Sequence, residues 1–402
     1  FEMFNDKLKK DKSKFKKKKV NIEFVSANPT GLMHIGHARG AILGDTLANL
    51  LTEAGYEVDR EYYINDAGNQ ISVLMDSVKY FYDKTTKKNV LKPKEFYPGE
   101  YIENLAKKLI NKGTEINFND NKDFLKKYII DLIIKDIKLD LRNLGVIHNI
   151  FVSEKEITTK ENVDLVIKKL KERKLAYEGF AEKPEGKTIE NWKPEKQLLF
   201  KSELIDDDKD RTLVKPNGDL TYFMSDIIYH SKKINRSYDM LLNIWGVDHS
   251  GYVKRIKNAV SALFDEKVNL NIQLTSLVNL LENKKPVKMS KRKGKFITLR
   301  EVIEDVGKDV IRFMMISRKA DKVIDFDFEI VKQQTKDNPI FYVKYAHARC
   351  CSIETLHGLK NFSDSEVTKC FGLLNLSEEI DLIIMLSNYV NTLNQSINKL
   401  EP

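Results

Sequence analysis

Cysteine and long apolar runs are scarce in this chain of 402 residues, and each scarcity excludes a class of protein. The three cysteines, Cys350, Cys351 and Cys370, match neither a disulfide framework nor the ligand spacing of a zinc site. No apolar run approaches the roughly 18 residues of a membrane span, and the N-terminus lacks the apolar core of a signal peptide. We therefore expect a cytoplasmic protein with no membrane segment and no metal held by its side chains.

Acidic residues are outnumbered, with 59 Asp and Glu against 68 Lys and Arg, which gives a formal charge of +9. Residues 1–19 hold nine Lys against three acids, so this tail carries two-thirds of the excess. A diffuse nucleic-acid-binding surface is therefore only weakly indicated by the total charge. A hydrophobic content of 42 % with 32 % charged residues fits a globular protein and excludes a wholly disordered one.

The segment after the basic tail predicts the opening of a parallel sheet. Residues 20–26 are rich in β-formers and end at the turn signal of residues 28–31, and leucines then recur at helical spacing up to Gly55. Residues 57–64 read as a second strand. Such a βαβ unit binds its ligand at the carboxyl end of the first strand.

Residues from about 71 to 200 interrupt this pattern, with helical stretches at about 100–112 and 122–144. We interpret them as an α-rich insertion, because a helix near 223–233 and a buried strand at 241–246 follow.

The C-terminal part is predicted to be helical, over residues 299–317 and then, after a boundary at 338–339, over 341–359 and 378–400. No internal repeat is present. Because the chain stops just after an amphipathic pattern, we expect this helical region to be incomplete.

The first chemical motif is His34-Ile35-Gly36-His37, at the start of the first predicted helix. Two imidazoles at i and i+3 share a face, the helix N-terminus attracts anions, and Gly36 lets a nucleotide approach the backbone. The arrangement suits the phosphates of ATP. A pair of surface or capping histidines is the alternative, whereas a zinc site lacks a third ligand at suitable spacing.

The second motif is Lys288-Met289-Ser290-Lys291, in a basic run that ends at Gly294. Several ammonium groups on a loop of this kind can neutralise a leaving pyrophosphate in the transition state. A solvated loop or a nonspecific nucleic-acid contact is the alternative.

The two motifs in this order resemble the HIGH and KMSK signatures of class I aminoacyl-tRNA synthetases. The stretch Ala27-Asn-Pro-Thr-Gly-Leu-Met-His-Ile-Gly-His37-Ala-Arg, together with Tyr345-Ala-His-Ala-Arg349, resembles the arginyl-tRNA synthetase family in particular. The similarity runs from about residue 20 to at least residue 349. Residues 1–19 resemble the linker to an N-terminal tRNA-contacting domain that this sequence does not contain.

The resemblance implies an α/β catalytic domain of Rossmann type at 20–338, with the insertion at about 71–200 and the KMSK loop and stem-contact region at about 275–338. It implies an all-α anticodon-binding bundle at 339–402, where Tyr342 and Tyr345 would stack on RNA bases. For these aromatic residues, packing in a core is the alternative.

The resemblance also implies the reaction: arginine and ATP, with Mg²⁺, give arginyl-adenylate and pyrophosphate, and arginine then passes to the 3′-terminal adenosine of tRNA(Arg). The residues with implied roles fall into three groups. The catalytic group is His34, His37, Lys288 and Lys291. The ATP-binding group is Gly36, Gly246, Asp248, His249, Met289 and Ser290. The arginine-binding group is Glu23, Asn28, Tyr222 and Asp226.

Physical chemistry supports the arginine group, because a guanidinium needs carboxylates and a carboxylate inside an apolar strand, such as Glu23, needs a cation. Tyr222 and Asp226 are four residues apart and share one face of a helix. The alternatives are an edge-strand position for Glu23, an exposed helix acid for Asp226 and a helix cap for Asp248. Such a pocket can reject wrong amino acids without editing, so we expect no proofreading domain. Separately, we expect the protein to be a monomer.

Three other functions remain open from the sequence. A small-molecule nucleotidylyltransferase shares the HxGH helix but needs no C-terminal RNA-binding helices. A synthetase-like RNA-binding protein without activity has no need of both motifs. The third is a synthetase for another amino acid; one specific for cysteine would contain zinc-ligand cysteines that are absent here.

Overall fold

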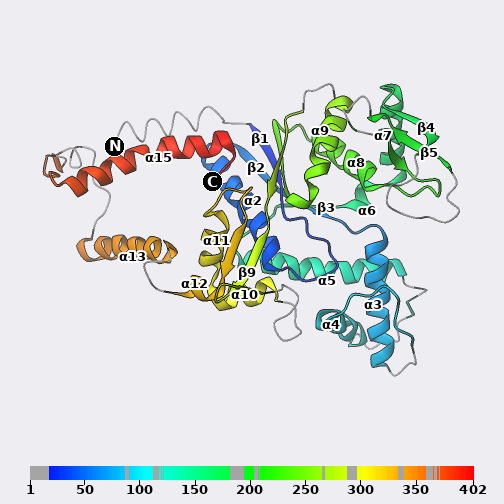
Figure 1. Ribbon diagram of the computed structural model, residues 1–402, viewed down its shortest axis with the longest axis horizontal. Coiled ribbons are helices and arrows are strands. Elements are labelled where there is room, and N and C mark those ends of the chain that lie inside the picture. The colour runs from blue at the N-terminus through cyan, green and yellow to red at the C-terminus, as the bar shows by residue number, and fades with distance from the viewer. Residues whose placement is uncertain are drawn as a thin grey trace.

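The structure is a computed structural model (Figure 1). It describes residues 18–86, 90–111, 117–118, 120, 122–181, 194–202, 207, 209–264, 268–287, 297–333, 339–358, 365, 369–370 and 372–402. Most of the basic tail and the predicted loop residues Lys288, Met289, Ser290 and Lys291 lie outside the described residues.

The centre of the molecule is a parallel sheet in which the first strand lies in the middle. Its order is β3 (Ile150–Ser153), β2 (Glu57–Ile64), β1 (Lys19–Glu23), β7 (Met240–Gly246) and β8 (Leu270–Thr275). Each neighbouring pair is parallel. The chain leaves β1 toward β2 on one side and returns as β7 on the other, and sheets of this kind bind their ligands outside the carboxyl ends of the two strands where the order reverses, here β1 and β7.

Helix α2 (Ile35–Glu53) follows β1 and packs on the sheet. Its apolar residues are buried in the largest core cluster together with those of β1, α3 and α5. The close approach depends on Gly44, since a Cβ there would lie 2.2 Å from the ring of Phe24. The predicted βαβ opening is confirmed, and its second strand has the expected bounds.

Arg39 ties α2 to the later part of the chain. Its side chain is buried, 2 % exposed, and its guanidinium donates to the carbonyl oxygens of Ser276 at 3.0 Å and Lys319 at 2.8 Å. A third carbonyl, that of Leu277, lies 3.4 Å away. A buried cation is tolerated here because several carbonyl dipoles surround it.

The stretch predicted as one insertion is divided by the central sheet. Between β2 and β3 lie α3 (Asn69–Thr85), α4 (Glu100–Ile110) and α5 (Lys122–Asn143). The four residues of β3 then pair with β2. The remainder is α6 (Glu154–Ile157), α7 (Lys160–Glu172) and an antiparallel sheet of β4 (Ala176–Phe180), β5 (Lys196–Phe200) and β6 (Arg211–Val214). Figure 1 shows α3 and α4 on one side of the sheet's edge and β4 and β5 on the other.

After β6 the chain returns to the main sheet. Helix α8 (Tyr222–Ile234) precedes β7, a short 3₁₀ turn (Val247–His249) follows it, and α9 (Ser250–Phe264) leads to β8. The helix and strand predicted near 223–233 and 241–246 are confirmed.

A smaller sheet and three helices follow β8. They are β9 (Val278–Glu282), β10 (Lys285–Pro286), α10 (Leu299–Val306), α11 (Lys308–Ile316), β11 (Ile324–Asp327) and α12 (Phe328–Lys332). The single helix predicted over 299–317 is two helices, because Gly307 has a φ of +81° and ends α10.

The last described elements are α13 (Pro339–His357) and α15 (Ser377–Lys399), which confirm the all-α character predicted there. α13 lies against α11, and α15 lies against α2 (Figure 1). Leu393 and Ile397 of α15 join the main core. Among the described helices, none is long and apolar enough to cross a membrane.

Candidate active site

The loop between β1 and α2 begins with two residues in a left-handed conformation. Val25 has a φ of 71° and Ser26 a φ of 41°, a region that non-glycine residues rarely adopt. The Ser26 hydroxyl accepts a hydrogen bond from the amide of Tyr63 at 3.0 Å and donates to Glu23 at 3.2 Å. This is why the strand ends at Glu23, three residues before its predicted end. Such strain is typical of functional sites.

His34 and His37 form a reciprocal cap at the start of α2. The Nδ1 atom of His34 accepts from the amide of Gly36 at 3.1 Å, and Nδ1 of His37 accepts from the amide of His34 at 3.2 Å. Their rings stack with centroids 3.8 Å apart. The capping alternative is therefore correct for the Nδ1 atoms, and the amide of Gly36 is engaged by His34.

Capping leaves these histidines with a defined protonation state. Burial lowers the pKa of His34, and burial, with the neighbouring His34, lowers the pKa of His37 to about 3. Both rings are neutral at pH 7, and because each Nδ1 accepts, each proton is on Nε2. The pair can donate two Nε2–H groups to phosphate oxygens at the positive end of a helix.

The end of β7 presents a second polar group. The Asp248 side chain is 75 % exposed, and one of its oxygens lies 3.5 Å from Nε2 of His249. A Cβ at Gly246 would lie 2.3 Å from the Asp248 carboxylate, so a side chain at position 246 would displace that carboxylate from its present position. Gly246 rather than Asp248 is the N-cap of the 3₁₀ turn, and the helix-cap alternative for Asp248 is not supported.

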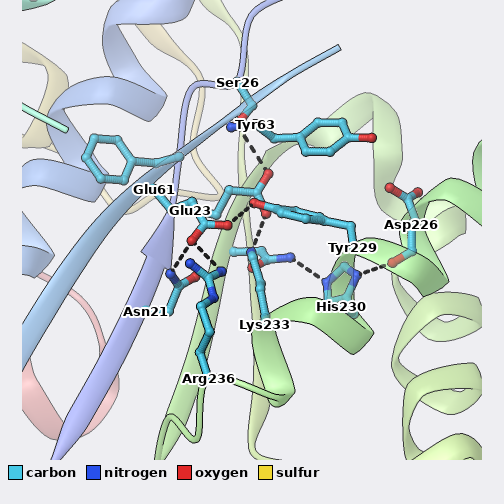
Figure 2. Close-up of polar contacts among 12 residues, drawn as sticks. Asn21, Glu23, Ser26, Glu61, Tyr63, Asp226, Tyr229, His230, Lys233 and Arg236 are labelled. Atoms are coloured by element: carbon cyan, nitrogen blue, oxygen red, sulfur yellow. Dashed lines mark hydrogen bonds and ion pairs between the residues drawn. The ribbon is translucent and has the colours of Figure 1, made fainter. Parts of the chain in front are cut away.

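Glu23 is buried in the middle of the sheet and already has a cation. Its Oε2 lies 2.7 Å from Nζ of Lys233, whose side chain is 0 % exposed. Figure 2 shows Lys233 reaching from α8 to Glu23. Because β1 is a central strand, the edge-strand alternative is wrong.

Asp226 is partly buried on α8, where it accepts a hydrogen bond from Tyr252 at 2.7 Å. Burial raises the pKa of Asp226 to about 7; the Tyr252 hydroxyl opposes the rise, while the charges of Glu23 and Glu154 add to it. The exposed-acid alternative is therefore wrong. The charge of Lys233 also lowers the pKa of Asp226, but it has the smallest effect of these groups.

Glu154 is a third acid at this edge. It is buried and accepts hydrogen bonds from Ser225 and Tyr63. Burial raises its pKa; those two hydrogen bonds and Lys126 act in the opposite direction, and Asp66 adds to the rise. With Asp226 it forms an acidic pair suited to a substrate cation.

The other two predicted arginine contacts are more open. Tyr222 begins α8 and is 66 % exposed, and Asn28 is an exposed residue of the β1–α2 loop. Among the described residues, no group of three or more His, Cys, Asp or Glu side chains could hold a metal ion.

Comparison with known proteins identifies the family. Residues 2–349 match the model of the class I tRNA synthetases (R), catalytic domain. The chain belongs to the arginyl-tRNA synthetases of class I.

Relatives of this synthetase agree. The arginine–tRNA ligase of Ehrlichia chaffeensis is 48 % identical over 388 residues, which cover 96 % of this chain and 67 % of the relative. The arginine–tRNA ligase of Wolbachia pipientis from Culex pipiens is 46 % identical over 384 residues, with 95 % and 67 % covered.

Solved structures support the synthetase fold. A Campylobacter jejuni chain assigned as an arginyl-tRNA synthetase has a TM-score of 0.83 at 33 % identity and covers 99 % of this chain and 85 % of its own length. The Thermus thermophilus arginyl-tRNA synthetase, at 16 % identity, has a TM-score of 0.67 over 99 % of this chain and 74 % of its own, which shows the fold alone.

The synthetase thus brings Glu23, Asp226 and the histidine pair to one edge of its sheet, while the roles assigned to them stay predictions. Sequence reasoning missed Glu154. A signal existed, because Glu154 directly follows a short β-rich segment, residues 150–153, and acids at strand ends line such crevices. Treating residues 71–200 as one insertion concealed it.

Proposed function

We propose that this chain ligates arginine to tRNA(Arg) in two steps, with ATP as the activating substrate. The observation that carries the proposal is that an acidic pair and a neutral histidine pair lie at the same sheet edge of an arginyl-tRNA synthetase. The acids suit a guanidinium, and the histidines suit phosphate.

In the first step, the arginine carboxylate attacks the α-phosphorus of ATP and pyrophosphate leaves. The Nε2–H groups of His34 and His37 would donate to phosphate oxygens as charge develops, which is where preorganised donors contribute most. Gly246, Asp248 and His249 would line the adenosine site.

Lys288 and Lys291, with Met289 and Ser290, would neutralise the pyrophosphate, and Mg²⁺ would arrive bound to ATP. These loop residues lie outside the described residues, but a hydrogen bond beside them supports the proposal. The amide of Leu299 donates to the carbonyl of Met33 at 2.7 Å. The chain therefore emerges from the loop next to His34.

The arginine side chain would be held by Asp226, Glu154 and Tyr222, with Glu23 behind them and Asn28 at the backbone groups. A guanidinium between two carboxylates leaves both satisfied, whereas a neutral amino acid leaves them unpaired. In the second step, a ribose hydroxyl of the 3′-terminal adenosine of tRNA attacks the adenylate carbonyl, and AMP leaves. We further propose a cytoplasmic monomer, as expected from the sequence.

The deciding experiment is aminoacylation of tRNA(Arg) with each of the twenty amino acids. Arginine should be charged well above all others, and preference for another amino acid would sink the proposal. Pyrophosphate exchange should require tRNA(Arg); exchange without tRNA would favour the nucleotidylyltransferase alternative.

A further inference from the structure

The internal cation Lys233 determines how the acids of the arginine pocket are shared. Its ammonium lies 2.7 Å from Glu23, 3.0 Å from Oδ1 of Asn243, and 4.3 Å from the ring centroid of Tyr229. Three donors of an ammonium are thus matched by three acceptors, of which the ring is the weakest. Glu23 is satisfied from inside the protein.

A chain of hydrogen bonds runs from Lys233 to the backbone of Asp226. Asn243 lies 2.9 Å from Nε2 of His230, and Nδ1 of His230 lies 2.8 Å from the carbonyl oxygen of Asp226 (Figure 2). Burial lowers the pKa of His230 to about 3, so the ring is neutral. The neutral ring accepts from the Asn243 amide and donates to the carbonyl, which fixes the spacing between Glu23 and Asp226.

The second buried acid nearby is also paired. Glu61 is 2.6 Å from Arg236 and accepts from Tyr229 and Asn21, each at 2.7 Å. In the part of the chain that the structure describes, Asp226 and Glu154 differ from these two acids in having no Lys or Arg in an ion pair, and Lys126 acts on Glu154 only from a greater distance.

The groups that face Asp226 come from five elements. They are Glu23 on β1, Tyr63 on β2, Glu154 on α6, Tyr252 on α9, and His230 and Lys233 on α8 itself. Of these groups in the described structure, only Lys233 is a cation, and its ammonium forms an ion pair with Glu23.

We propose that arginine enters this pocket in exchange for one proton held by Asp226, because Lys233 occupies Glu23 and leaves the Asp226–Glu154 pair one cation short. The inference rests on the proposed function and deepens it. Before arginine binds, the proton on Asp226 neutralises one negative charge of the acidic pair. When the guanidinium arrives, the proton leaves for solvent, and the total charge balances.

Calorimetry can count this proton. L-arginine is titrated into the protein at pH 6 in two buffers of different ionisation enthalpy, and the heats give the protons released per arginine. With a carboxyl pKa of about 7, release should be about 0.9 proton at pH 6 and about 0.1 at pH 8. As the pH rises toward 7, the Kd for arginine should fall about tenfold per pH unit. Above pH 7 the Kd should level off. Binding without proton release at pH 6 would overturn the proposal.

Two substitutions should shift the release curve in opposite directions. Tyr252→Phe removes a donor to Asp226, so the midpoint should move to higher pH. Glu154→Gln removes a like charge, so the midpoint should move to lower pH. L-citrulline, a neutral analogue, should bind weakly and release no proton; release with citrulline equal to that with arginine would contradict the exchange.

Lys233→Met tests the internal cation, with Lys232→Met as its neighbour and control. Lys233 lowers the pKa of Asp226, so without this cation the empty site should keep its exchangeable proton to higher pH, and the release at pH 8 should exceed that of the wild type. One guanidinium still replaces one proton, so the count should not exceed one, and the control should match the wild type. If Lys233→Met does not fold, the Tyr252→Phe and Glu154→Gln shifts still decide the matter. Arginine that fails to bind or to be charged at any pH would instead contradict the proposed function.

Discussion

The carboxyl edge of the central sheet and the C-terminal helices bury opposite kinds of side chain. At the edge, the polar residues Glu23, Glu61 and Lys233 are buried and held by named partners. Along α13, whose residues are all described, Ile340 is the buried one, and Leu356 is 77 % exposed.

The difference shows which of the two regions tolerates substitution. Buried charges are costly without partners, so the edge tolerates little change. The exposed apolar residues of α13 and α15 cost little to alter in this chain, because they contact solvent.

The largest expected effect is at His37. His37→Asn keeps an acceptor for the amide of His34 but loses the Nε2 donor, so kcat should fall about 10²–10³-fold, as when one oxyanion donor is removed. The apparent Tm should stay near that of the wild type. If the apparent Tm falls and the loss of kcat is explained by the smaller folded fraction, the role of His37 is limited to capping α2.

The next effect concerns arginine binding. Asp226→Asn should raise the KM for arginine about 10–100-fold, since hydrogen bonds to charged groups contribute about 1.5–3 kcal/mol. The KM for ATP should change little. Asp248→Asn is the control and should show the reverse pattern; equal changes in both KM values for Asp226→Asn would indicate a structural role.

Two glycines of α2 test the packing behind the edge. Gly44→Ala should destabilise the protein by about 1–3 kcal/mol, because its Cβ would overlap Phe24. Gly40, where a Cβ meets nothing within 4 Å, is the control, and Gly40→Ala should stabilise by about 0.5–1 kcal/mol. Denaturant unfolding measures both, and equal signs would contradict this account of α2.

The smallest effect is expected in the C-terminal helices. Leu356→Ser should change the free energy of unfolding by no more than about 0.5 kcal/mol. Leu393→Ser, in the part of α15 that joins the core, should cost about 3 kcal/mol. A large loss at Leu356 would show that this exposed side chain of α13 is packed in the folded protein, and the contrast between the two regions would fail.

Local signals in the sequence predicted much of this fold. The strand at 57–64 and the helix over 35–53 carry strong periodicity and turn residues, and both were found at or near the predicted bounds. Glu23 was recognisable because an acid in an apolar strand needs a cation. What decides its state, Lys233, is 210 residues away, and no local pattern connects the two.

Other features were out of reach for the same reason. β3 has four residues and belongs to the main sheet only through its pairing with β2, so periodicity alone could not separate it from an insertion. The Nδ1 hydrogen bonds of His34 and His37 depend on backbone geometry at one helix end, and a motif cannot report which nitrogen carries the proton.

Arg39 has a consequence for the order of events during synthesis. Its guanidinium lies on a helix made early, yet its most distant acceptor, the carbonyl of Lys319, is translated 280 residues later. At about 5–20 residues per second, that interval is roughly 15–60 s. The guanidinium of Arg39 can therefore reach its final, buried environment only after residues 276–319 have been translated.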